Sequence, residues 1–362
     1  MSCFEAKEKN IMTNGTNYIK EIIAHAVENG SRTARVTGEW EIDEAIRLPS
    51  NFTLILEDCH LRLADGSYTN IFVNEHNETE IGRTTAGTDR NISIIGRGRA
   101  ILDGGEYNGL GEKVPIEERK APIYKNNLLL FTNVDGFKIE GIHFRNQRWW
   151  ALNFIYCANG YLGNIDFCAN DTAIDDEGKV YHGLCRSKYH HVLVKNADGI
   201  DLRQGCHDIV IENITGFTED DTIALTALDG STERAFKVGE LPSDICDVKI
   251  KNVRSAAYCS NVRLLNQGEI KLHDIEVDGV YDDSEASEHM DRGRYAVRVG
   301  DVHKYGARHS TADETYNITV KNVYSRGKAA IALAGEIGEL VIYGIEAADG
   351  TVMIEDNRDK GE

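Results

Sequence analysis

The sequence predicts an all-β solenoid, a right-handed parallel β-helix with one capping helix at its N-terminal end. Three observations support this fold class. A six-residue pattern of alternating apolar positions recurs along the chain, several copies lie 22 or 23 residues apart, and 34 glycines with only 4 prolines can supply many turns. Alternation is typical of a strand with one buried face, and a short fixed period is typical of a coiled repeat.

The recurring pattern reads apolar, any, apolar, any, then Gly, Asn or Asp, then apolar. Copies begin at Ile92, Phe137, Gly160, Ile209, Val248, Ile270, Ile318 and Leu340. Three of the longer intervals between copies are close to twice the short one. The fifth position suits a residue with positive φ. A doubly wound α/β sheet would need helices of ten or more residues between its strands, and these connections are too short for that.

Residues 14–30 are predicted to form the capping helix. Asn14 or Thr16 can cap its start. Its apolar residues fall on one face at helical spacing, and they are Ile19, Ile22, Ile23 and Ala26. The first coil of a solenoid exposes an apolar end, so we expect this face to cover it.

The strands are expected to begin within residues 39–65, and residues 1–362 are predicted to form a single β-helix domain. Three polar stretches interrupt the repeat, and we expect them to be loop insertions: 105–126, 229–244 and 281–294. Such loops often line a binding cleft.

The composition excludes several classes of partner. A formal net charge of −19 argues against non-specific binding to nucleic acid or to anionic membranes. No apolar run of about 18 residues occurs, and the first fifteen residues contain no apolar core of a secretory signal. The eight cysteines are scattered without a CxxC pair, which is typical of reduced thiols. The sequence therefore predicts a cytoplasmic protein without metal or cofactor, and no feature indicates an oligomeric state.

Three aspartates form the most informative cluster. Asp198 and Asp221 are 23 residues apart, about one coil, and Asp220 adjoins Asp221. Successive coils lie about 4.8 Å apart, so the three carboxylates are expected to meet on one outer face. Their mutual repulsion raises at least one pKa, and glycoside hydrolysis needs one protonated and one ionised carboxyl group. The alternative is that Asp198 and Asp201 only cap turns, and that the Asp pair is solvated or binds Ca²⁺.

Short motifs around these aspartates point to a known family. Residues 196–198 read Asn-Ala-Asp and continue as Gly-Ile-Asp, residues 220–221 read Asp-Asp, and residues 146–153 contain two adjacent tryptophans. These segments resemble the Asn-Thr-Asp, Asp-Asp and Ser-Pro-x-Trp motifs of the polygalacturonase family, glycoside hydrolase family 28. The resemblance covers nearly the whole chain.

The resemblance implies roles for the site residues. Asp220 would be the general acid, while Asp198 and Asp221 would hold and deprotonate the attacking water, with inversion at the anomeric carbon. Arg263 or Arg298 would bind a substrate oxygen or carboxylate, although each is equally compatible with a surface ion pair. Further residues expected to contact the oligosaccharide substrate are Asn196, Asp201, Tyr258 and Trp150.

Two family motifs are altered. The coil at residues 257–261 lacks the histidine of Gly-His-Gly, and Ala296–Gly300 resembles the Arg-Ile-Lys segment without its lysine. The resemblance thus implies a glycosidase with a changed set of substrate ligands, exo-acting on short oligosaccharides, including ones that contain uronic acid. The alternatives are a β-helix lyase, a glycan-rearranging transferase, or a non-catalytic carbohydrate-binding solenoid.

Overall fold

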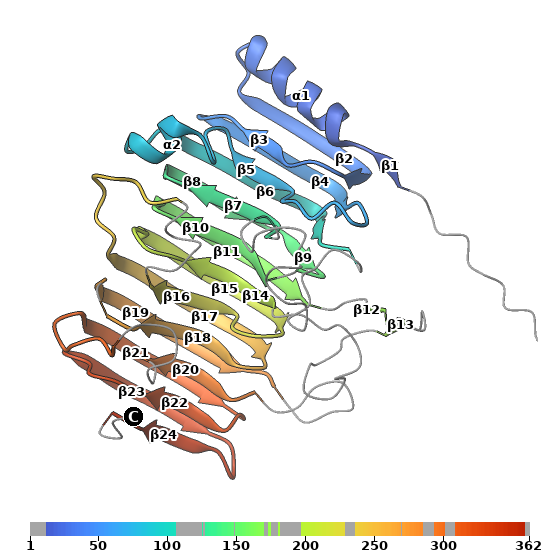
Figure 1. Ribbon diagram of the computed structural model, residues 1–362. Helices are drawn as coiled ribbons and strands as arrows, with labels where there is room; N and C mark the ends of the chain where they lie inside the picture. Colours follow the sequence, from blue (N-terminus) through green and yellow to red (C-terminus); the bar gives the residue numbers. More distant parts are fainter. Residues whose placement is uncertain are drawn as a thin grey trace, which may run out of the picture.

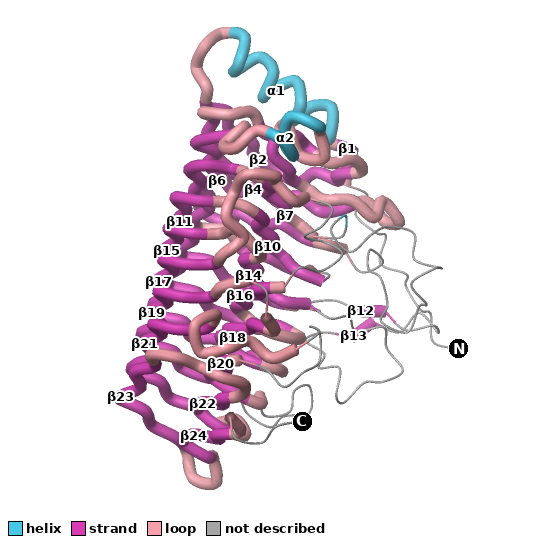
Figure 2. The backbone as a smooth tube through the Cα atoms, turned by 60° about the vertical axis from the view of Figure 1, so that its left-hand side comes forward, coloured by secondary structure: helices cyan, strands magenta, loops and turns pink. Residues whose placement is uncertain are grey.

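The protein is a parallel β-helix, which confirms the predicted fold class (Figure 1). The computed structural model describes residues 12–105, 125, 127–147, 149–169, 173–174, 180–181, 197–228, 236–268, 270–284, 293–300 and 308–358. Two long parallel sheets run along the stack of coils, as Figure 2 shows in a view turned by 60°.

Sheet A is the longer of the two and has twelve strands. Its strands are β1 (Thr13–Asn14), β2 (Thr33–Ile42), β4 (Phe52–Leu63), β6 (Asp89–Asp103), β8 (Val134–Glu140), β9 (His143–Arg145), β11 (Ala158–Cys168), β15 (His207–Thr218), β17 (Ile245–Ala257), β19 (Leu272–Asp282), β21 (Thr315–Ser325) and β23 (Leu340–Ala347). They are hydrogen-bonded to one another in chain order, except that β9 pairs with β6 and β11, so each coil pairs with the next.

Sheet B has ten shorter strands. They are β3 (Ile46–Leu48), β5 (Phe72–Asn74), β7 (Leu129–Thr132), β10 (Trp149–Ile155), β14 (Ala197–Leu202), β16 (Ile223–Ala227), β18 (Ser260–Asn266), β20 (Tyr295–Val299), β22 (Ala329–Leu333) and β24 (Val352–Asp356). A separate antiparallel pair joins β12 (Ala173–Ile174) to β13 (Val180–Tyr181), and a short helix α2 spans Glu80–Thr84.

Identical register between coils builds the core. In sheet A, Ile211 pairs with Ile250, and Ile250 with Val277, and all three are completely buried. In sheet B, Ile200 pairs with Ile223, which is also completely buried. Each inward side chain therefore packs on its counterpart one coil away, and burial of a side chain of this size contributes about 1.5–3 kcal/mol.

Helix α1 (Thr16–Glu28) covers the first coil, as predicted (Figure 1). Ile19, Ile23 and Ala26 are buried, and Ile22 packs against the same core while staying partly exposed. The side chain of Asn14 accepts a hydrogen bond from the backbone N–H of Thr16 at 3.0 Å, which satisfies one of the free amide groups of the first turn.

Asparagines occupy the turn position of the repeat. Asn164, Asn213 and Asn252 have φ of 53°, 57° and 51°, the left-handed region that asparagine tolerates better than most residues. The amide of Asn213 donates to Asn164 at 3.1 Å, and Asn252 donates to Asn213 at 2.6 Å. The polar fifth position of the sequence pattern thus forms a hydrogen-bonded ladder between coils.

One predicted copy of the repeat is wrong. The pattern beginning at Ile270 is not in register with the others, because Val248 pairs with Ile275. Ile270 precedes β19, and Asp274 occupies a different turn, with φ of 56°. The true copy begins at Ile275 and has Gly279 at the positive-φ position. Both frames alternate apolar residues and end in a turn former, so the sequence pattern could not separate them.

The long intervals between copies are single coils with insertions. β6 pairs directly with β8, and β11 pairs directly with β15, although each pair contains one of the doubled intervals. The extra residues are inserted between the end of a sheet A strand and the start of the next sheet B strand. They therefore do not disturb the register of either sheet. The side on which sheet A strands end and sheet B strands begin is called the A-to-B corner below.

The predicted loop insertions fall largely outside the described residues. In 105–126 only Gly105 and Lys125 are described, and in 229–244 only the part from Phe236 onward. In 281–294 the first two residues belong to β19, so that prediction began too early. Neither described helix is long enough, at 13 and 5 residues, to cross a membrane.

The asparagine ladder gives a stability prediction. Asn213→Ala is expected to lower the free energy of unfolding by about 1–3 kcal/mol. It removes two side-chain hydrogen bonds, and alanine tolerates a positive φ less well than asparagine does. Asn213→Gly loses the same bonds but keeps an unstrained backbone, so its loss should be smaller. Urea unfolding followed by circular dichroism measures both, and equal stability of the alanine variant and the wild type would contradict the ladder's role.

Candidate active site

The register of sheet B brings the predicted site residues to neighbouring coils. Trp150 pairs with Asp198, and Ala224 pairs with Arg263, which in turn pairs with Arg298. Asp198 lies at the start of β14, at the A-to-B corner, where the turn between β15 and β16 also places residues 220–221. The corner and the sheet B strands that follow it therefore gather side chains from positions as far apart in sequence as Trp150 and Arg298.

The spacing brings Asp198 against the turn at residues 220–221, as expected, but Asp198 and Asp221 are buried and do not lie open on an outer face. The backbone N–H of Asp221 donates to the Oδ1 of Asp198 at 3.2 Å, and the N–H of Gly199 donates to the carbonyl of Asp221 at 3.0 Å. Asp198 is 6% exposed and Asp221 1%, whereas Asp220 is only half-buried. Asp198 thus caps the neighbouring turn, and of the three only Asp220 presents an appreciable surface to solvent.

A second acidic group adjoins this trio. Asp201 is 1% exposed, and its Oδ1 lies 3.4 Å from Nη1 of Arg203. The guanidinium of Arg203 lies over the ring of Trp150, 4.5 Å from the centroid. The geometry places Asp201 in a buried ion pair and covers one face of Trp150 with a cation, so that face is closed to a sugar ring. Asn196 lies outside the described residues.

Arg263 and Tyr258 also lie against the aspartates or their neighbours. Nη1 of Arg263 is 3.3 Å from the Oδ2 of Asp221. Tyr258 lies on the coil after Asp220, where its hydroxyl accepts a hydrogen bond from Nη2 of Arg294 at 3.4 Å. Arg298 is one coil further along sheet B, 5.8 Å from the ring centroid of Tyr295.

Burial and crowding raise the pKa values of the acids. Burial raises the pKa of Asp198 well above its ordinary value, and the charges of Asp201, Asp220 and Asp221 raise it further. Burial also raises the pKa of Asp201, against the lowering effect of Arg203. For Asp221, burial raises the pKa to about 6, although the charge of Arg263 lowers it. The cluster consequently retains protons near neutral pH, which acid–base catalysis requires.

Sequence reasoning missed three residues at this corner. Arg203 follows Asp201 by two positions, so strand alternation could have placed both on one face. Cys259 lies in the coil where the family histidine was expected, and its backbone N–H donates to the carbonyl of Asp220 at 3.3 Å. Burial raises the pKa of the Cys259 thiol, so it stays neutral. Arg294 lies in a predicted loop insertion, and nothing in the sequence pattern indicated its contact with Tyr258.

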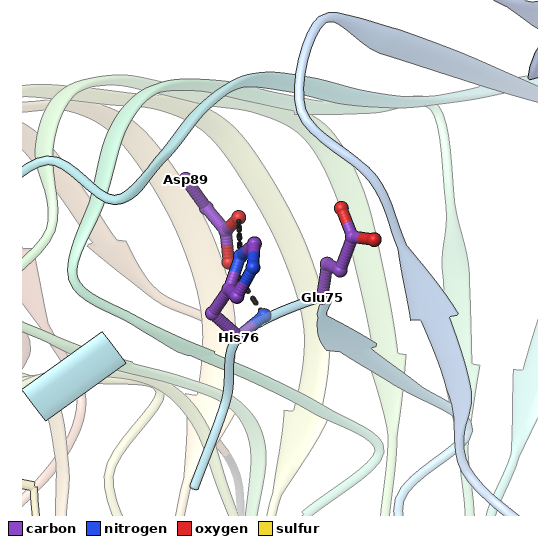
Figure 3. Close-up of side chains that lie close together, drawn as sticks. All are labelled: Glu75, His76 and Asp89. Carbon is purple, nitrogen blue, oxygen red and sulfur yellow. Dashed lines mark hydrogen bonds and ion pairs between the residues drawn. The ribbon is translucent and has the colours of Figure 1, made fainter. Parts of the chain in front are cut away.

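A possible metal-binding group lies away from the aspartates. Among the described residues, ligand atoms of Glu75, His76 and Asp89 lie within 4.8 Å of one another. Figure 3 shows that Asp89 bonds instead to His76, to Nδ1 at 2.7 Å and to the backbone N–H at 2.9 Å. Asn74 donates to the same carboxylate at 2.6 Å and Ser50 at 3.2 Å. These four donors occupy the Asp89 oxygens, so this group is a structural hydrogen-bond network.

A parallel β-helix with this acidic corner defines a class of protein, the glycan-degrading enzymes built on a β-helix. The family model described as glycosyl hydrolases family 28 matches residues 48–239, more than half of the chain. The chain belongs to that family and is a glycoside hydrolase. No curated protein matches the sequence.

Solved structures of similar fold have low sequence identity. A 1,3-α-1,4-β-D-galactose-4-sulfate-3,6-anhydro-D-galactose-2-sulfate 4-galactohydrolase is 13% identical with a TM-score of 0.61, over 98% of this chain and 88% of that one. An exopolygalacturonase from Thermotoga maritima is 15% identical with a TM-score of 0.58, over 95% and 88%. The tailspike of E. coli bacteriophage HK620, in complex with a pentasaccharide, is 14% identical with a TM-score of 0.59, over 96% and 61%. At these identities the likeness establishes the fold.

The buried carboxyl group of Asp198 gives a prediction for stability. Its folded-state pKa is raised, so the unfolded state ionises first and stability falls as pH rises from about 4 toward the folded-state pKa. Asp198→Asn removes this loss, and its thermal midpoint should exceed that of the wild type by several degrees at pH 7.5 and by much less at pH 4. Asp349→Asn, at an exposed carboxylate, is the control. A gain that is independent of pH would refute the electrostatic explanation.

Proposed function

We propose that the protein is an inverting glycoside hydrolase that cleaves short oligosaccharides, including ones that contain uronic acid. The contact between Asp198 and Asp221 beside the half-exposed Asp220 carries this proposal. An inverting enzyme needs one carboxylic acid for the leaving oxygen and one carboxylate for the attacking water. The corner supplies both kinds of group in different environments.

Asp220 is proposed as the general acid. It is the most accessible member of the trio, so a glycosidic oxygen can approach its carboxyl group. Protonation of that oxygen lets the C–O bond break while positive charge develops on the sugar ring, and the proton leaves with the departing sugar.

Asp221 is proposed as the general base. With a pKa of about 6 it is mostly ionised at neutral pH, and the ion pair with Arg263 stabilises that form. A buried carboxylate engaged with an arginine is poorly placed to attack the anomeric carbon itself, but it can accept a proton from a bound water. This arrangement favours inversion over a covalent intermediate.

Asp198 is proposed to position the water. Its Oδ1 accepts the N–H of Asp221, and burial keeps its proton at neutral pH. A protonated carboxyl group can donate a hydrogen bond to the water while Asp221 accepts one. The pair titrates as a unit, so either residue can hold the shared proton in a given step.

The proposal also covers the size of the substrate and the compartment in which the enzyme acts. One structure of similar fold is an exopolygalacturonase, which supports exo action. Among the described residues, Cys59, Cys157, Cys206, Cys246 and Cys259 are free thiols, in accord with a reducing, cytoplasmic compartment. Short oligosaccharides are the glycans that a cytoplasmic enzyme would encounter.

Replacing each aspartate tests the assigned roles. Asp220→Asn and Asp221→Asn are expected to lower kcat by about 10²–10⁴-fold, because each removes acid or base catalysis. Asp198→Asn should retain more activity than either, because asparagine resembles the protonated acid that this position holds. Turnover of a panel of short galacturonides and neutral oligosaccharides measures kcat, and proton NMR of the first product gives its anomeric configuration.

The other possible functions give different results in the same experiment. A product with retained configuration would exclude the inverting mechanism. An unsaturated sugar product would identify a lyase, and a new linkage would identify a transferase. Binding without turnover by the wild type would identify a carbohydrate-binding solenoid.

Arg263 gives a prediction for the pH profile. Arg263→Gln removes the cation that lowers the pKa of Asp221, so Asp221 would ionise only at a higher pH. Because the base must be ionised, the acidic limb of kcat/KM against pH is expected to move toward neutral pH. Arg254→Gln, which breaks the ion pair with Asp283 on sheet A, should leave the limb unchanged. An unshifted limb in Arg263→Gln would contradict the assignment of Asp221.

A further inference from the structure

Arg294 lies at the A-to-B corner one coil after Tyr258. Its backbone N–H donates to the carbonyl of Tyr258 at 3.3 Å, and the N–H of Cys259 donates to the carbonyl of Asp220, also at 3.3 Å. Three successive coils therefore place Asp220, then Tyr258 and Cys259, then Arg294 side by side. The charge of Asp220 acts on Arg294 across this short span.

The side chain of Arg294 is held by an aromatic ring. Its guanidinium carbon lies 5.1 Å from the ring centroid of Tyr258, and Nη2 donates to the phenolic oxygen at 3.4 Å. Contact with a ring engages the flat face of a guanidinium, whereas anions bind to its N–H edge. The tyrosine therefore orients the arginine and leaves most of that edge for a ligand.

Among the described residues, no carboxylate is paired with Arg294. The chain has 59 acidic and 40 basic residues, and two other arginines near the aspartates form ion pairs, Arg203 with Asp201 and Arg263 with Asp221. Within the described part of the chain, no carboxylate oxygen lies within 4.0 Å of Arg294. Arg294 is exposed, has no acidic partner in the described part of the chain, and lies beside the proposed general acid in an acidic protein. It is therefore suited to an anion that arrives with the substrate.

We propose that Arg294, oriented by Tyr258, binds an anionic substituent, a carboxylate or a sulfate, on the sugar that carries the leaving oxygen. The inference rests on the proposed role of Asp220, because the general acid contacts that oxygen and so fixes which sugar lies next to Arg294. It also accounts for the two altered family motifs. Arg294, from the coil after Cys259, would supply a positive charge where the family's histidine and lysine are missing. Arginine suits this task because its fork binds a planar or tetrahedral oxyanion through two N–H groups.

The experiment compares Arg294→Gln with Arg254→Gln. Arg254 is the matched control, because its guanidinium also lies over a tyrosine, 4.3 Å from the ring of Tyr281, but on the outer face of sheet A. Binding of trigalacturonate, its methyl ester and a sulfated galactose trisaccharide is measured by calorimetry, and turnover of the same compounds is measured in parallel. Circular dichroism confirms that both variants fold.

Arg294→Gln is expected to weaken binding of the matching anionic trisaccharide by about 10- to 100-fold, the loss of a charge-assisted hydrogen-bonded pair. In the same variant, binding of the methyl ester should change less than about threefold. Arg254→Gln should leave the binding of both the anionic trisaccharide and the ester unchanged. The effect should appear mainly in KM, because the substituent carries the same charge before and during bond cleavage. Arg294→Lys should recover part of the affinity. The carboxylate and sulfate ligands show which anion the site prefers.

Failure of this inference differs from failure of the proposed function. If the wild type binds and cleaves the ester as well as the acid, or if Arg294→Gln behaves like Arg254→Gln, the anion site is refuted while hydrolysis stands. If no glycan is cleaved but Arg294→Gln still loses anion-selective binding, the proposed hydrolysis fails and the anion site stands.

Discussion

In-register stacking of parallel coils is the constraint on which the rest of this structure depends. A residue on one coil lies beside its counterpart on the next, so a chain of short local repeats becomes a continuous core of aligned side chains such as Ile211 and Ile250. The same alignment operates on the polar side of the chain. It lines up turn asparagines in sheet A, and it places acids from different coils in contact at the A-to-B corner. In-register stacking of successive coils therefore determines both the core and the position of the acidic residues.

The corner combines two opposing electrostatic demands. Four aspartates lie close together, and three of them are buried, which disfavours their charged forms. Arg203 and Arg263 offset part of this cost through ion pairs with Asp201 and Asp221. The remaining imbalance keeps protons on the cluster near neutral pH, and glycosidic bond cleavage needs a carboxyl group that can donate a proton. The aspartates thus destabilise the fold for the same reason that they suit catalysis, and the hydrogen-bonded coils around them must offset that cost.

Much of the fold and of the site followed from local sequence patterns. Alternating apolar positions predicted strands, and the interval between Asp198 and Asp221 predicted their contact because it equals one coil. The copy at Ile270 was misplaced, because two overlapping frames satisfy the same pattern and only pairing with β17 distinguishes them. Doubled intervals were single coils, because an insertion at a corner leaves no trace in the strands on either side. Arg294 went unrecognised because its contacts all come from another coil.

The sequence by itself determined the class of fold, the order of the coils, the capping helix and the identity of the acidic trio, because all of these depend on periodicity and on interactions within one or two coils. Only the tertiary structure decided how each acid is protonated and which arginine it pairs with. Burial and charge separation depend on distances between side chains from several coils, and no spacing along the chain specifies them. The same limit explains why Trp150 was expected to contact the substrate, whereas the folded chain places Arg203 on its ring.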